Sequence, residues 1–173
     1  MKKKICLLMA LVLGLSLCAC GKGQEVQKPF PPAETTQALM ESGAYTEQLE
    51  KLDLDIAVMM FWLGGEVSDY AGSEIYYSTG ATAEIAAVIS VADESKVSEV
   101  EQALKVWVES QIEAEKTYRP AEAAKLEEAI IEVRGASVAL VVAADREKAA
   151  AVLAEQYRKK TTCSQRTGRF SYR

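Results

Sequence analysis

The spacing of apolar residues predicts two amphipathic helices, each of which begins after an aspartate. After Asp93 and after Asp145, apolar side chains recur at steps of three and four, which is the period of a helix with one buried face. Aspartate is also a favourable N-cap residue. Pro120 separates the first helix from a short helix that carries Glu122. The positions with this period are Val97, Val100, Leu104, Trp107, Val108 and Ile112, then Ala149, Val152, Leu153 and Tyr157.

Four short segments rich in β-branched or aromatic residues predict two hairpins. Residues 75–79 and 84–91 flank a turn at Gly80, and residues 130–133 and 138–143 flank a turn at Gly135. Each half of the chain therefore contains a strand, a turn, a strand, an aspartate cap and a helix. A shift of 52 residues aligns the halves, with Ala87 on Ala139 and Asp93 on Asp145. We expect an α+β fold in which two ββα units form a four-stranded antiparallel sheet, with both helices on one face and further helices at the N-terminus.

Large and small side chains alternate along the second predicted strand. Ile85, Ala87 and Ile89 share one face, and the smaller Ala86 and Val88 share the other. The second face requires a cover, and we expect the helix over residues 56–63 to supply it. That segment is apolar all round and precedes Gly64 and Gly65, so it predicts either a core helix or a methionine-rich groove for a partner. Residues 34–52 predict two short helices separated by residues 42–44.

The N-terminus predicts an export signal. Three lysines at positions 2–4 precede an apolar run over residues 5–17, which is shorter than the roughly 20 residues needed to span a bilayer. The end of this run resembles the bacterial lipoprotein signal, in which the cysteine corresponding to Cys20 is acylated and becomes the new N-terminus. We therefore expect a signal peptide over residues 1–19, a lipidated Cys20 with a proline-bearing linker to residue 33, one domain over 34–157, and a disordered basic tail over 158–173. The expected location is the outer face of the cell membrane, in a Gram-positive bacterium.

Charge is distributed unevenly along this chain. Residues 20–157 contain 11 basic and 25 acidic residues, a net charge of −14, which argues against nucleic acid as a partner. Residues 158–173 contain six basic residues and no acidic one. This tail either lies against anionic lipid or wall polymer, or is a terminus without function.

Catalytic chemistry has few candidates. The chain contains no histidine and no asparagine, which excludes Ser-His-Asp triads and histidine-containing zinc sites, and Cys163 would be a lone tail thiol. Neither a cofactor nor a metal site is predicted. Neighbouring carboxylates fit either acid and base catalysis or solvated helix faces. They are Glu50, Asp53 and Asp55, then Glu113 with Glu115, and Glu127 with Glu128.

Three aromatic residues are candidates for contact with a ligand or partner. Trp62, Tyr70 and Tyr76 lie close together in sequence, and such side chains stack on sugars and peptides or pack in a core. Because successive side chains of a strand point to opposite faces, Tyr76 and Tyr77 cannot serve one surface.

Several short motifs at the ends of the predicted helices and strands resemble those of a domain of unknown function, number 4358, found on lipoproteins of Gram-positive bacteria. These motifs are Leu63-Gly64, Glu84-Ile85-Ala86, Tyr118-Arg119-Pro120 and Gly135 ahead of residues 138–142. The resemblance spans about residues 45–156 and implies no catalytic residues.

The expected function is that of a non-catalytic binding or interaction module at the cell envelope. Its partners would be the membrane, through the lipid on Cys20, and an envelope protein or wall polymer. The alternatives are a carboxylate-dependent cell-wall hydrolase, which needs two facing acidic residues in a cleft, and a structural assembly protein, which needs a large exposed apolar patch.

Overall fold

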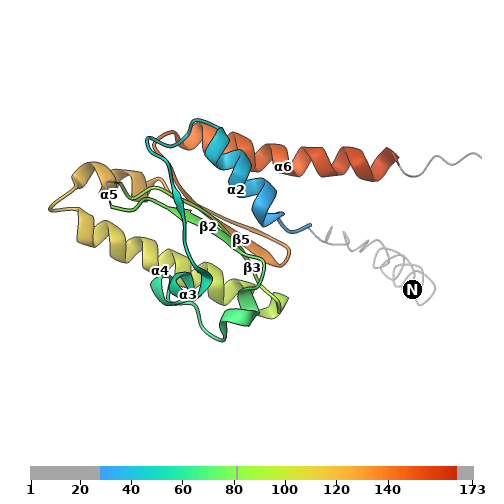
Figure 1. The fold of residues 1–173 in the computed structure, drawn as a ribbon, viewed down its shortest axis with the longest axis horizontal. Coiled ribbons are helices and arrows are strands. Elements are labelled where there is room, and N and C mark those ends of the chain that lie inside the picture. Colours follow the sequence, from blue (N-terminus) through green and yellow to red (C-terminus); the bar gives the residue numbers. More distant parts are fainter. Residues whose placement is uncertain (1–27, 81, 167–173) are drawn as a thin grey trace, which may run out of the picture.

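A five-stranded antiparallel sheet lies between two layers of helices in the computed structural model, which describes residues 28–80 and 82–166, with side chains through residue 156 (Figure 1). The strand order is β1-β2-β3-β5-β4. The strands are β1 (Glu50–Lys51), β2 (Glu74–Tyr77), β3 (Ile85–Ser90), β4 (Ile130–Arg134) and β5 (Ser137–Val142). The helices are α2 (Pro32–Glu41), α3 (Leu54–Met60), α4 (Val97–Glu115), α5 (Pro120–Glu127) and α6 (Arg146–Arg166), with short 3-10 turns η1 (Val67–Tyr70) and η2 (Glu94–Lys96).

Both predicted hairpins are confirmed. Strand β2 pairs with β3 and β4 pairs with β5, and the two inner strands then pair with each other. The predicted alternation is also confirmed, since Ile85, Ala87 and Ile89 lie in one buried cluster and Ala86 and Val88 in another, on the opposite face. The sheet is therefore buried on both sides.

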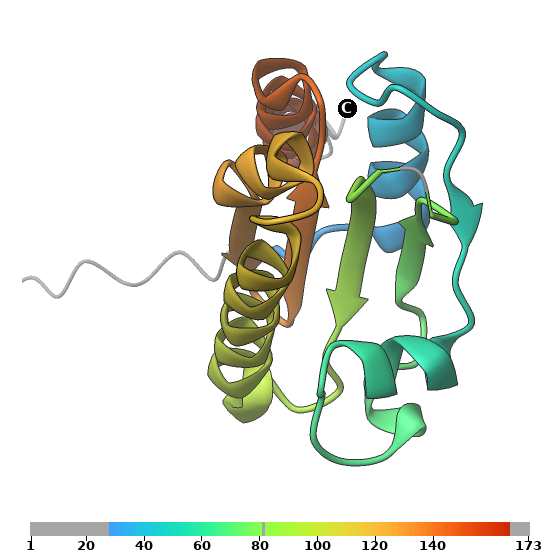
Figure 2. The same cartoon turned by 90° about the vertical axis from the view of Figure 1, so that its left-hand side faces the viewer.

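The prediction that both long helices share one face is wrong. Helix α4 covers the face of Ile85, and α6 covers the face of Ala86, as Figure 2 shows from the side. In the β3–β5 ladder Ala87 pairs with Leu140 rather than with Ala139. Paired residues point to the same face, so Ala87 and Ala139, which are equivalent under the 52-residue shift, point to opposite faces. The helix that follows each inner strand consequently packs on the opposite side.

The predicted cover of the second face is also wrong. Helix α3 packs on the large-residue face beside α4, and α2 lies with α6 on the face of Ala86. The second helix expected before residue 52 is absent from residues 42–52, where the chain is irregular and then forms β1, the fifth strand. With two residues, β1 is too short to show the alternation of apolar and polar residues by which a strand is predicted.

The termini extend past the boundaries expected from the sequence. Phe30, within the predicted linker, is buried, and its N–H donates to Ser137 Oγ at 2.9 Å. The backbone of α6 continues to Arg166, into the predicted tail. The predicted signal peptide, Cys20 and residues 167–173 lie outside the described residues. Within the described part of the chain, no helix has the length and apolar character needed to cross a bilayer.

Candidate functional site

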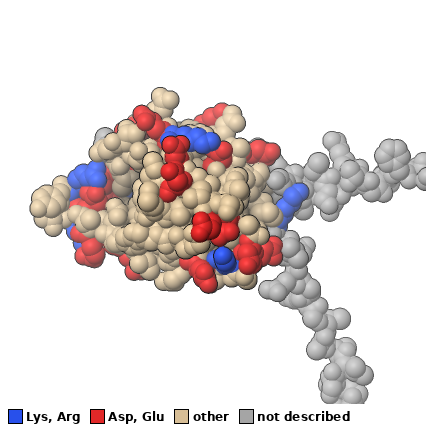
Figure 3. All heavy atoms as spheres, turned by 60° about the horizontal axis from the view of Figure 1, so that its bottom comes forward, with Lys and Arg blue, Asp and Glu red and all other residues tan. Residues whose placement is uncertain are grey.

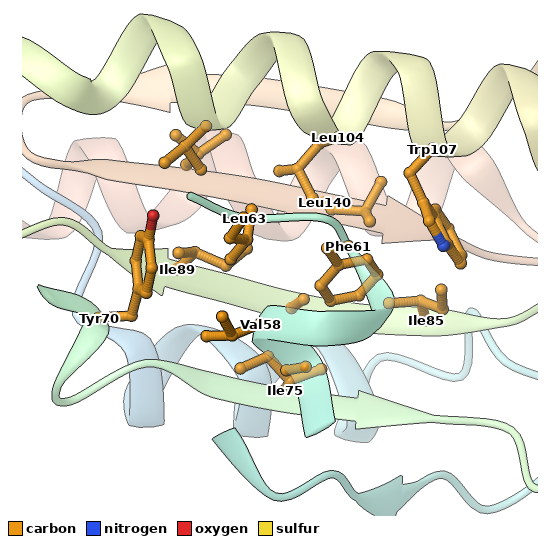
Figure 4. Close-up of a cluster of buried hydrophobic side chains, with 14 of the residues drawn as sticks. Val58, Phe61, Leu63, Tyr70, Ile75, Ile85, Ile89, Leu104, Trp107 and Leu140 are labelled. Carbon is orange, nitrogen blue, oxygen red and sulfur yellow. The ribbon is translucent and has the colours of Figure 1, made fainter. Parts of the chain in front are cut away.

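Helix α3 places apolar side chains both in the core and in solvent. Ala57 and Val58, together with Phe61 just after the helix, are buried in the cluster beneath α4 (Figure 4). The Phe61 ring meets the Trp107 ring edge-on, with 4.9 Å between centroids. On the other side, Ile56, Met59 and Trp62 remain 44%, 68% and 55% exposed. Ile56 and Met59 lie three apart on one side of α3, and Trp62 belongs to the turn that follows it. We call these three exposed side chains the α3 ridge.

Trp62 reaches the ridge through an unfavourable backbone conformation. It follows the helix with φ +54°, in the left-handed region, where glycine is the usual residue. The turn is a Schellman motif, because Trp62 N–H donates to the Met59 carbonyl at 3.3 Å and Leu63 N–H donates to the Val58 carbonyl at 2.9 Å. We expected Gly64 and Gly65 to end this helix, but the left-handed residue comes two positions earlier. A bulky exposed indole therefore occupies a position where glycine would cost less free energy.

The surroundings of the α3 ridge are acidic. Asp53, Asp55 and Glu66 flank it in sequence and are exposed. From residue 52 to residue 95 the chain has eight acidic residues and no lysine or arginine, and the bordering Lys51 and Lys96 pair with Glu74 and Asp69 of this stretch. Figure 3, which views the molecule from the side of α3 and α4, shows a broad uncharged surface with both acidic and basic groups around it. Because acidic residues outnumber basic ones in this part of the chain, an apolar and basic partner is favoured.

A pocket of about 140 Å³ lies beside α3, at the end of the sheet. Met60 contributes one wall, and strands β2 and β3 with the loop between them, helix α4, and helix α5 with the residue before it contribute the others. Its lining includes Met60, Tyr77, Trp107, Gln111, Glu115 and Arg119.

Behind this pocket, Glu84 is a fully buried carboxylate with three hydrogen-bond donors. Its oxygens accept from Thr46 N–H at 2.9 Å, from Thr46 Oγ1 at 2.7 Å and from Lys125 Nζ at 3.1 Å. Lys125 Nζ also lies 3.2 Å from Glu122 Oε1. Burial alone would lower the pKa of Lys125, but hydrogen bonds to Glu84 and Glu122 outweigh it and hold that pKa above its usual value. Glu84 and Lys125 thus form a buried ion pair that joins three segments.

Two other carboxyl groups near the pocket have pKa values below their usual range. Arg119 donates to Glu115 and lowers the pKa of that carboxyl. Hydrogen bonds from Ser78 and Thr82 lower the pKa of Glu47. A general acid at neutral pH needs the opposite shift, which neither Glu47 nor Glu115 has.

The remaining predicted carboxylates do not converge on a common site. Glu113 pairs with Lys116 on α4, and Glu128 pairs with Arg146. Glu50 lies on β1, while Asp53 and Asp55 lie at the start of α3. Over the residues that the structure describes, no three potential metal ligands are grouped.

The structure separates the three aromatic candidates. Trp62 is on the α3 ridge. Tyr70 is only 2% exposed, and its hydroxyl donates to the Gly64 carbonyl, so it supports the loop after α3 from the core. Tyr76 packs on the other face of the sheet, beside Tyr45 and Leu49. Ile56 and Met59 were not among the candidates, although the all-apolar run that contains them was the signal for a partner surface.

Comparison with known proteins yields one match. The family described as "Domain of unknown function (DUF4358)" matches residues 42–143. No curated protein and no solved structure match this chain. The matched region contains the whole sheet and the α3 ridge, and it leaves out α2 and α6.

Proposed function

The chain belongs to the DUF4358 family, and from that premise we propose that it is a lipid-anchored interaction module on the outer face of the cell membrane. The acyl group on Cys20 would hold the domain at the membrane, and the α3 ridge would contact a protein of the envelope. The domain would perform no chemistry of its own.

The exposure of the α3 ridge is the observation that carries this proposal. Tryptophan and other large apolar side chains dominate the binding energy of protein interfaces. Here three of them are exposed within seven residues, and Trp62 remains exposed in spite of a strained backbone. A requirement for folding does not explain this arrangement, because the buried side of α3 already supplies the core with Ala57, Val58 and Phe61.

Photocrosslinking in cells tests the proposal. A photoreactive amino acid at Met59 should give a discrete crosslinked product in the membrane fraction, and the additional change Trp62→Asn should abolish it. The matched control is the same amino acid at Ala151, which is exposed on α6, on the opposite side of the sheet. Products of equal yield from both positions would contradict a specific surface at α3.

The anchor is tested separately. Cys20→Ser should move the protein from the membrane fraction to the soluble fraction, and should remove labelling by a fatty acid. If the purified domain hydrolysed wall polymer, the claim that it has no chemistry would fail whatever the outcome for Cys20.

A further inference from the structure

We propose that the α3 ridge binds the segment 167–173 of a second copy of this chain. This inference rests on the proposed function, because it names the partner of the same surface. The segment reads Thr-Gly-Arg-Phe-Ser-Tyr-Arg, so an arginine lies on each side of its two aromatic residues. Phe170 and Tyr172 would pack on Ile56, Met59 and Trp62, and Arg169 and Arg173 would meet the acidic residues that flank the ridge.

Charge complementarity is the first argument for this occupant. Residues 20–157 have a net charge of −14, whereas residues 158–173 have six basic residues and no acidic one. The ridge itself lies in the stretch from residue 52 to residue 95, which has eight acidic residues and no basic one, and in which Lys51 and Lys96 at the borders pair with only two of the eight, Glu74 and Asp69. Opposite charges of this size steer association and fix its orientation.

The position of α6 is the second argument, and it favours a neighbouring copy over the same molecule. Helix α6 lies on the face of the sheet opposite α3 and projects beyond the edge of the sheet (Figures 1 and 2). The last residue of the helix, Arg166, therefore lies away from the ridge of its own chain.

Anchoring supplies the third argument. A seven-residue segment buries little area, and such contacts are weak in dilute solution. Copies held on one membrane by Cys20 meet at a high effective concentration, which makes a weak contact productive. Because the ridge and the segment are different surfaces, each contact leaves one of each free, and head-to-tail chains can grow.

Sedimentation of purified protein tests the inference directly. The probe is the chain from residue 20 onward with Cys20→Ser and Cys163→Ser, which removes the anchor and the lone thiol. One variant changes Trp62→Asn, and the other changes both Phe170→Ala and Tyr172→Ala. Asparagine tolerates the left-handed conformation, so the Trp62 variant should unfold at no lower temperature than the parent.

The parent should associate beyond the dimer as its concentration rises, and each variant alone should associate at least about tenfold more weakly. An equimolar mixture of the two variants should form a dimer and nothing larger. Only one intact ridge and one intact segment are then available, so a single contact can form. Raising the salt concentration should weaken every complex.

A parent that stays monomeric up to about millimolar concentration, the range that tethering supplies, or a mixture that does not regain the dimer there, would overturn the inference. So would a tail variant whose only defect is weaker binding to anionic lipid vesicles, since that result assigns the segment to the membrane. If self-association fails while Met59 still crosslinks to another protein in cells, the proposed function stands without this inference. If Met59 crosslinks to nothing, both fail.

Discussion

At the scale of single residues, the buried Glu84 shows how one carboxylate can join distant parts of this chain. It links the loop at Thr46 and the helix α5 to the beginning of β3. A buried ion pair contributes little compared with a well-packed apolar pair, but removing one partner leaves the other charged and unsatisfied.

We therefore expect Glu84→Ala to lower the free energy of unfolding by about 3 kcal/mol, near the lower end of the range for buried pairs because Lys125 retains some exposure. Urea unfolding at neutral pH measures this loss. The matched control is Glu101→Ala, which breaks the exposed Glu101–Lys105 pair on α4 and should change stability by less than about 1 kcal/mol. The double variant Glu84→Leu with Lys125→Met should recover part of the loss. Equal effects of Glu84→Ala and Glu101→Ala would show that the pair is not buried in solution.

At the scale of elements, the small side chains on the second face of the sheet determine how closely α6 approaches. Ala139 and Ala143 meet Ala149 and Leu153 of the helix in one buried cluster. A face of alanines leaves no room for a longer side chain, because protein interiors are close-packed.

Ala149→Leu should consequently lower the free energy of unfolding by about 1–3 kcal/mol through overpacking. Ala151→Leu makes the same chemical change two positions along, on the exposed side of α6, and should stay within about 0.5 kcal/mol of the parent. Thermal or urea unfolding of both variants checks the pair. If Ala151→Leu lowered the free energy of unfolding more than Ala149→Leu, α6 would have to be rotated about its axis, so that Ala151 faced the sheet.

At the scale of the whole molecule, acidic groups on several elements are stabilised in their charged form. Hydrogen bonds lower the pKa of Glu47, Asp93, Glu115 and Asp145, which lie on four separate segments. A group whose folded pKa lies below its unfolded value contributes stability above the unfolded pKa, and loses it as the pH falls through the folded pKa.

The protein should therefore lose stability as the pH falls below about 4.5, the unfolded pKa of a glutamate. The double variant Glu47→Gln with Glu115→Gln should be less stable at pH 7 and should lose less on acidification. Urea unfolding between pH 7 and pH 3 at physiological salt measures how the free energy of unfolding of the parent and of the double variant depends on pH. If the two proteins showed the same dependence, these two carboxylates would not be held by Ser78, Thr82 and Arg119 in the folded protein.

The fold could be predicted where the decisive contacts are local. The period of Val97 to Ile112 and the turns at Gly80 and Gly135 were sufficient for α4 and for both hairpins. Strand β1 could not be predicted, since two residues have no period. For the candidate site, the pattern pointed to Trp62 and to a methionine-bearing apolar segment, but it could not show that Met59 stays in solvent while Phe61 is buried.

Short-range periodicity was enough to define the hairpins, the long helices and the alternating faces of β3, because each depends on neighbours within a few positions. The count of charged residues was enough to define the acidic character of the body. Folding decided which face each helix covers and which side of α3 remains exposed. Both depend on the register between β3 and β5, strands about 50 residues apart in sequence, in which a slip of one position would exchange the two faces.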